Sequence, residues 1–163
     1  MKIGLFVIVA LLMTSTVATA QHQHGTQTLI DGRETPELIP DSVAYQNFFL
    51  ARSLPATNAS DEERKHLDYK IHTLGLDTQD ELQFRLEMTR YRIKFDNLVA
   101  SHSRLAEKGL VAADVFNAGA AKLVAETRDL LAKSLSPSGQ QQFEDAVLAM
   151  RKNTRYITTG GAK

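Results

Sequence analysis

The chain contains no cysteine among its 163 residues, so it can form no disulfide and has no thiolate nucleophile. A domain without disulfides depends on its apolar core for stability. The chain also lacks an excess of either charge, because 19 Lys and Arg residues balance 19 Asp and Glu residues. Proteins that bind nucleic acid carry a basic excess, so this composition argues against nucleic acid as a partner.

Motifs of common catalytic sites are missing as well. The sequence has no Gly-rich phosphate loop, no Gly-x-Ser-x-Gly and no His-Glu-x-x-His. A hydrolase needs a nucleophile, a base and an orienting group together, and no such set stands out. We therefore expect a protein that is not an enzyme, with no catalytic residue and no cofactor.

The first 20 residues have the pattern of a cleaved export signal. Lys2 provides a positive start, residues 3–13 form an apolar run, and residues 18–20 (Ala-Thr-Ala) form a small-residue cleavage site. The apolar run is shorter than the ~20 residues that cross a bilayer. We expect a mature chain that begins at Gln21, is exported to the periplasm or the cell exterior, and has no membrane span.

The longest periodic stretch, residues 78–108, predicts one long helix. Thr78 and Glu81 form a capping box at its start, and Gly109 favours a left-handed stop at its end. Its main stripe of apolar residues is spaced alternately by four and three, which is typical of a coiled-coil seam. The main stripe consists of Phe84, Met88, Tyr91, Phe95, Leu98, His102 and Leu105.

A second stripe lies on the opposite side of this helix and consists of Leu82, Leu86, Thr89, Ile93 and Ala100. A predicted helix at residues 42–54 carries an aromatic face, Tyr45, Phe48 and Phe49, that is large enough to cover it. We expect these two faces to meet within the chain. The alternative is that the second stripe contacts a partner. The candidate partner surface is then Tyr45, Phe48, Phe49, Leu82, Leu86 and Ile93.

Three further helices complete the predicted fold. Ser60 and Glu63 form a second capping box for a helix that ends before Gly75. A fourth helix ends near residue 134, and Ser136 caps a fifth that continues to about residue 157. The pattern predicts an all-α, single-domain bundle of about five helices around the long helix.

The arrangement of this bundle can also be predicted. The fourth and fifth helices should be antiparallel neighbours of the long helix, while the first two helices cover its back. Residues 41–158 form the helical domain. Residues 21–40 form a leader and a Pro-rich strap, because Pro36 and Pro40 forbid a helix there. Residues 159–163 form a flexible tail.

Two resemblances support an exported helical protein. The first rests on Asp31-Gly32, Pro36-Glu37, Ile39-Pro40-Asp41, Ala44-Tyr45 and Phe48-Phe49. This run resembles the opening of a family of uncharacterised exported bacterial helical proteins, which implies export and a helical fold but no activity. The second rests on Leu76-Asp77 before Gln83-Phe84 and Leu135-Ser136 before Gln142-Phe143. These helix starts loosely resemble the Leu-Thr-x-x-Gln starts of Spy/CpxP-type periplasmic chaperones, although Gly139 replaces the second Gln.

Histidines offer the main alternative site. His22 and His24 lie beside the expected mature amino terminus, and Glu62–His66 and Asp68–His72 are pairs one helical turn apart. Two ligands are too few for a closed metal site, so we expect no metal. His102 falls in the main stripe, where an interior histidine satisfied by a neighbouring helix is the usual arrangement.

The function predicted from these observations is a protein-binding or scaffolding component of the bacterial envelope, with a possible homo-oligomer. Two alternatives remain open. A Spy-like holdase chaperone would expose an apolar groove to its clients, and a metal-binding periplasmic protein would gather His22, His24 and carboxylates.

Overall fold

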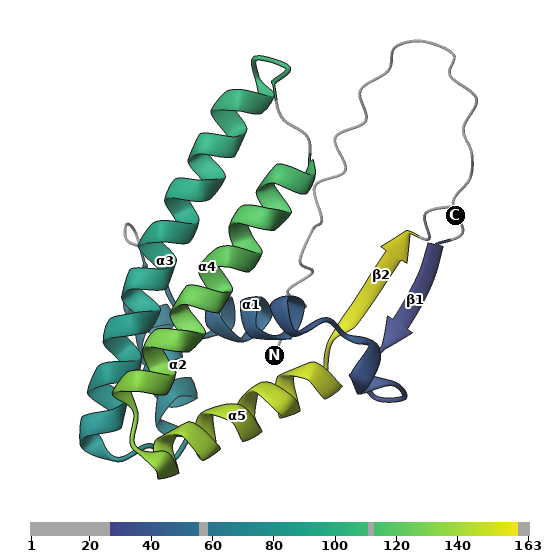
Figure 1. Ribbon diagram of the computed structural model, residues 1–163. Coiled ribbons are helices and arrows are strands. Elements are labelled where there is room, and N and C mark those ends of the chain that lie inside the picture. The colour runs from purple at the N-terminus through teal and green to yellow at the C-terminus, as the bar shows by residue number, and fades with distance from the viewer. Residues whose placement is uncertain (1–26, 56–58, 111–112, 160–163) are drawn as a thin grey trace, which may run out of the picture.

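The computed structural model describes residues 27–55, 59–110 and 113–159. Its elements in chain order are β1 (Gln27–Asp31), the 3-10 helix η1 (Pro36–Leu38), α1 (Asp41–Ala51), α2 (Asp61–His72), α3 (Thr78–Ala106), α4 (Ala113–Ser134), α5 (Pro137–Lys152) and β2 (Arg155–Thr159). The predicted all-α bundle around one long helix is confirmed, with a two-stranded sheet beside it (Figure 1). No helix in the described ranges combines the length and apolar character needed to cross a membrane.

Most helix ends follow the predicted local signals. Ser60 accepts a hydrogen bond from the Glu63 N–H, and the Glu63 carboxylate accepts one from the Ser60 N–H, which completes the capping box of α2. Gly75 and Gly109 adopt left-handed backbone angles, with φ of 73° and 70°. Glycine has no Cβ to oppose this conformation, so both residues end a helix at little cost.

The start of α3 differs from the prediction in one residue. Its cap is Asp77, whose carboxylate accepts a hydrogen bond of 2.8 Å from the Asp80 N–H, instead of Thr78. A carboxylate at this position also interacts favourably with the positive end of the helix dipole, which a hydroxyl does not. The far end of α3 lies at Ala106, two residues before the predicted end.

The core is a cluster of aromatic rings at the meeting point of α1, α3 and α5. Phe48 and Phe49 of α1 are fully buried. The Phe48 ring centre lies 6.1 Å from that of Phe84 in α3 and 5.5 Å from that of Phe143 in α5. The ring centre of Phe49 lies 5.0 Å from that of Tyr91 in α3. Tilted and edge-to-face pairs at such distances stabilise a core beyond the area that they bury.

This placement overturns the prediction that α1 covers the second stripe. The rings of α1 instead contact the main stripe of α3 near Phe84 and Tyr91. From Phe95 onward the main stripe is partly covered by α4, where Phe116 lies 6.2 Å from Phe95, and Leu105 at its end is exposed. The main stripe holds the large rings of α3, so covering its lower half with α1 removes more apolar area from water than covering the second stripe would.

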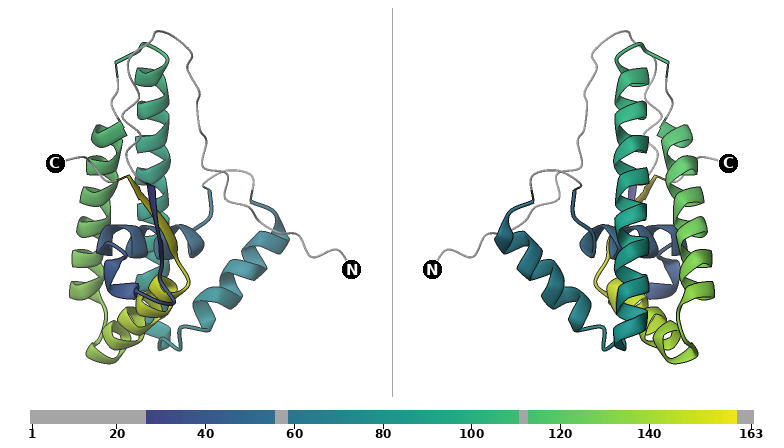
Figure 2. Two further views of the ribbon diagram at one scale, coloured as in Figure 1. Left: turned by 90° about the vertical axis from the view of Figure 1, so that its right-hand side faces the viewer. Right: turned by 90° about the vertical axis from the view of Figure 1, so that its left-hand side faces the viewer.

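The helices are also arranged differently from the prediction. As expected, α4 runs antiparallel beside α3 (Figure 1). In contrast, α5 crosses the lower end of these two helices and does not lie alongside α3. Figure 2 shows that α2 diverges from α3 after their shared turn, so α2 does not cover the back of the long helix either.

The starts of α3 and α5 are joined by a buried carboxylate. Asp80 accepts a hydrogen bond of 2.8 Å from the Ser136 N–H and another from the Ser136 hydroxyl. Gly139 allows this approach, because a Cβ there would lie only 2.1 Å from Asp80 Oδ2. Gly139 replaces the glutamine of the chaperone pattern, and this close approach explains why a glycine is needed there. Any larger side chain would separate the two helix starts.

The two ends of the described chain form an antiparallel ribbon that we did not predict. β1 pairs with β2 so that Leu29 faces Ile157 and Ile30 faces Tyr156. The predicted fifth helix, which continued to residue 157, therefore ends at Lys152, and the helical part covers residues 41–152 and not 41–158. Residues 155–159, predicted as the end of a helix and the start of a tail, contain β-branched residues that favour a strand.

The predicted strap is partly packed on the helices. Ile39 is buried in the core cluster, and Gly32 sits against the backbone of Arg151. Leu29 and Leu38 of the same segment are exposed. Residues 21–26 of the predicted leader and 160–163 of the predicted tail lie outside the described residues.

Candidate functional site

The second stripe of α3 is a row of exposed apolar side chains. Leu82, Leu86 and Ile93 are 59%, 43% and 46% exposed, respectively. They lie on one face of the helix, and the exposed Thr89 lies between them. From Leu82 to Ile93 the row is roughly 16 Å long at ~1.5 Å per residue. Three large apolar side chains in a row on a rigid helix form a surface suited to another protein.

The six candidate residues are therefore split into two groups by the structure. Leu82, Leu86 and Ile93 are exposed and available to a partner. The other three, Tyr45, Phe48 and Phe49, are buried in the core and cannot contact one while the protein is folded. The candidate surface is the second stripe alone.

The lower end of the second stripe opens on a small hollow beside the turn between α2 and α3. The hollow has a volume of about 220 Å³ and is lined by His72, Leu76, Thr78, Glu81 and Leu82. Arg85 joins α2 to α3 just above it, with a 2.6 Å contact to Asp68 and a 2.7 Å contact to Glu81. This ion-paired junction holds the lower end of the stripe in place.

Charged side chains give the stripe two different edges. On one edge, Arg90 and Lys94 have half-exposed side chains, while Glu87, the partner of Arg90 at 2.6 Å, is buried. On the other edge, Arg92 pairs with Asp96 at 2.9 Å, and Asp96 is the more exposed of the two. Lys94 contacts the half-exposed Glu126 at 3.6 Å, so the positive charge on the first edge comes mainly from Arg90, whose partner is buried. The second edge is close to neutral.

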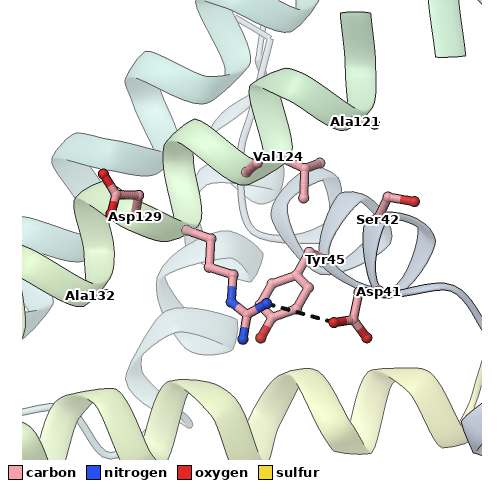
Figure 3. A pocket seen from close by; sticks show the side chains of 9 residues that line it. Asp41, Ser42, Tyr45, Ala121, Val124, Asp129 and Ala132 are labelled. Carbon is pink, nitrogen blue, oxygen red and sulfur yellow. Dashed lines mark ion pairs between the residues drawn. The ribbon is translucent and has the colours of Figure 1, made fainter. Parts of the chain in front are cut away.

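A second hollow, between α1 and α4, holds a group of interacting charges (Figure 3). It has a volume of about 370 Å³ and is lined by Asp41, Ser42, Tyr45, Ala121, Val124, Ala125, Arg128, Asp129 and Ala132. The Arg128 guanidinium lies 4.5 Å from the centre of the Tyr45 ring and 3.6 Å from carboxylate oxygens of both Asp41 and Glu144. These contacts connect α1, α4 and α5.

The charges in this hollow satisfy one another. The Tyr45 hydroxyl donates a hydrogen bond to Glu144, and Arg151 pairs with Asp41. Burial, and then the Glu144 carboxylate, raise the pKa of Tyr45, so its hydroxyl remains a hydrogen-bond donor at any physiological pH. We interpret this group as a structural contact between three helices, because its ionic groups are already paired.

A third hollow lies between the end of α1 and α2. It has a volume of about 1370 Å³. Its apolar lining comes from Leu50, Leu54 and Leu67, and Lys65 and Lys70 are among its charged residues. Residues 56–58, which follow α1 and precede α2 in the sequence, lie outside the described residues.

The histidines predicted as alternative ligands are spread over the structure. In the described residues, no three His, Asp or Glu side chains lie close enough together to hold a metal ion. Asp68, predicted as a possible partner of His72, pairs with Arg85 instead. His102 is half-buried against the ring of Phe116, with 4.9 Å between ring centres. His22 and His24 lie outside the described residues.

The chain was compared with protein-family models, curated proteins and solved structures. No protein-family model matches the chain, and neither a curated protein nor a solved structure matches it.

Proposed function

We propose that this protein is a non-catalytic, exported component of the bacterial envelope that binds another protein through the second stripe of α3. The exposure of Leu82, Leu86 and Ile93 carries this proposal. Contiguous apolar surface on a folded protein is characteristic of a contact site. The export-signal pattern of the first 20 residues supports the location.

The spacing of the stripe indicates the kind of partner. Residues 82, 86, 89 and 93 are separated by four, three and four, the spacing of a seam between two helices. The exposed charge of Arg90 on one edge, whose partner Glu87 is buried, favours an acidic side chain opposite it. The partner that fits is an amphipathic helix with an apolar seam and an acidic flank.

The test uses exposed residues, so that folding is preserved. We expect Leu86→Asp with Ile93→Asp to abolish capture of the partner from an envelope fraction. Leu148→Asp is the matched control, because Leu148 of α5 is as exposed as Ile93, at 46% each, but lies outside the stripe. Circular dichroism melting confirms that all variants fold. Capture that survives the double substitution, or that is lost equally in the control, would contradict the proposal.

Charge reversal tests the partner's chemistry separately. Arg90→Glu with Lys94→Glu should weaken binding of an acidic helix and make the remaining binding less sensitive to salt. If the same change strengthens binding, the partner carries basic residues at this edge and its proposed chemistry is wrong.

A holdase role is the second candidate, and the wide hollow between α1 and α2 favours it. Its apolar lining, including Leu54 and Leu67, would suit an unfolded segment of a client protein. A holdase suppresses aggregation of many unrelated proteins, whereas a scaffolding protein binds one partner. Light scattering of an aggregating model protein, with Leu67→Glu as the variant, distinguishes the two roles.

Export itself is tested by intact mass. The protein recovered from the periplasm or medium should begin at Gln21. A product that retains Met1 would place the protein at the membrane and contradict the proposed location.

A further inference from the structure

The ribbon of β1 and β2 has one face toward the core and one toward water. Ile30 and Tyr156 pack against the core cluster. Leu29 and Ile157, which face each other across the strands, are each 59% exposed. Two strands alone are marginally stable in water, and further strands or a packed helix stabilise them. An additional strand paired at an edge of this ribbon would therefore stabilise it.

The hydrogen-bond pattern identifies which backbone groups are available. The Gly32 N–H donates to the Thr154 carbonyl oxygen at 2.9 Å. Antiparallel partners exchange hydrogen bonds at every second pair, so the observed register assigns the exchanging pairs to Ile30–Tyr156 and Thr28–Thr158. The N–H and C=O groups of Leu29 consequently point away from β2, along the outer edge of β1. Those of Ile157 point along the outer edge of β2.

The outer edge of β1 is the better exposed of the two. Figure 1 places β1 on the side of the ribbon away from the helices. Within the described part of the chain, β1 pairs with β2 alone. Its centre, Thr28-Leu29-Ile30, has none of the charges, prolines or bulges by which edge strands avoid pairing. The charge at the end of β1, on Asp31, is compensated by Arg155 at 3.2 Å.

We propose that this edge pairs with β1 of a second copy of the chain. A two-fold axis at Leu29 makes the strands antiparallel, and the two Leu29 residues exchange both hydrogen bonds. The edge is then complementary to itself, as a symmetric dimer requires. The sheet becomes four-stranded, with the β1 strands in the middle and a β2 strand on each side. Leu29 and Ile157 of both copies form one apolar row across its face.

This dimer is weak and is separate from the proposed partner site. Pairing of two five-residue strands buries little surface, which places the contact at the low end of interface sizes. The second stripe of α3 takes no part in it, so either proposal can fail without the other.

Cross-linking tests the predicted register. The chain has no cysteine, so one introduced thiol reports one contact. Leu29→Cys places two thiols on facing residues with Cα atoms about 5.5 Å apart. Ile157→Cys places them three strand spacings, roughly 14 Å, apart. A bifunctional thiol reagent shorter than that span should link the first variant into a dimer and leave the second as single chains. Equal linking of both, or no linking of the first, overturns the proposal.

Proline substitution tests the edge without breaking the ribbon. Leu29→Pro removes an N–H that points outward, while the hydrogen bonds between β1 and β2 remain. Ile157→Pro is the matched control, because it makes the same change on the opposite edge. Circular dichroism melting verifies the fold of each variant.

Sedimentation equilibrium between about 10 µM and 1 mM then measures the mass in solution. The unmodified protein and Ile157→Pro should approach twice the mass of one chain, while Leu29→Pro remains at one. A single-chain mass for the unmodified protein at every concentration, or loss of the dimer in Ile157→Pro alone, overturns the proposal.

Discussion

Replacing Gly139 with alanine should destabilise the protein only while Asp80 is present. The added Cβ would lie 2.1 Å from Asp80 Oδ2 and 2.7 Å from its Cγ, so the starts of α3 and α5 would have to separate. Separation breaks the two hydrogen bonds that Asp80 accepts from Ser136. A hydrogen bond to a charged group contributes about 1.5–3 kcal/mol, so we expect Gly139→Ala to cost about 3 kcal/mol or more.

Asp80→Ala should cost a similar amount, because it removes the same two hydrogen bonds. In the double variant, the nearest remaining atom of residue 80 is its Cβ, 3.3 Å from the new methyl group, which requires only a small adjustment. Alanine also favours a helix over glycine by roughly 1 kcal/mol. The double variant should therefore be at least as stable as Asp80→Ala alone.

Urea denaturation followed by circular dichroism measures these free energies of unfolding. A loss of about 3 kcal/mol corresponds to a fall in Tm of roughly 10 °C for a domain of this size. Gly119→Ala is the matched control, since its added Cβ meets the flexible end of Leu98 at 3.0 Å and should cost much less. Losses that add up in the double variant would refute a shared contact between Asp80 and Gly139.

Three further predictions concern the core and the second stripe. Phe48→Asp should abolish cooperative thermal unfolding, because it places an unpaired charge against Phe84 and Phe143; a folded variant would contradict the aromatic core. Tyr91→Phe should raise the free energy of unfolding by about 1 kcal/mol, because the buried Tyr91 hydroxyl has no hydrogen-bond partner among the described residues; a loss in urea denaturation would mean that the hydroxyl is bonded. Ile93→Asp should change stability by no more than about 0.5 kcal/mol, as a substitution at an exposed site does; a large loss would mean that the second stripe is covered.

The helices and their ends are determined by the sequence itself. Ser60 with Glu63, Ser136 before Pro137 and the glycine at 109 act on backbone groups within a few residues of themselves. Such signals act locally and do not depend on the rest of the chain. The starts predicted from them, those of α1, α2, α3 and α5, were therefore correct or off by one residue. The second stripe is likewise visible from periodicity alone.

Tertiary structure decides which surfaces are covered. Periodicity shows that α3 has two apolar faces, but the face that the rings of Phe48 and Phe49 cover depends on how side chains from α1, α4 and α5 fill the same space. Covering the main stripe buries the larger rings and leaves Leu82 in water. The prediction that the aromatic face of α1 covers the second stripe was therefore wrong, and the role of the exposed stripe as a contact surface stays a prediction.

Contacts between distant segments are also decided by the fold. Residues 155–159 form a strand only because Gln27–Asp31 lies beside them and supplies the partner strand. The hydrogen bonds of Asp80 with Ser136 require two helix starts to meet, and nothing local to either start specifies the other. Helix caps are stabilised by hydrogen bonds to neighbours along the chain. Strand pairs and buried carboxylates are stabilised by hydrogen bonds to partners that only folding brings together.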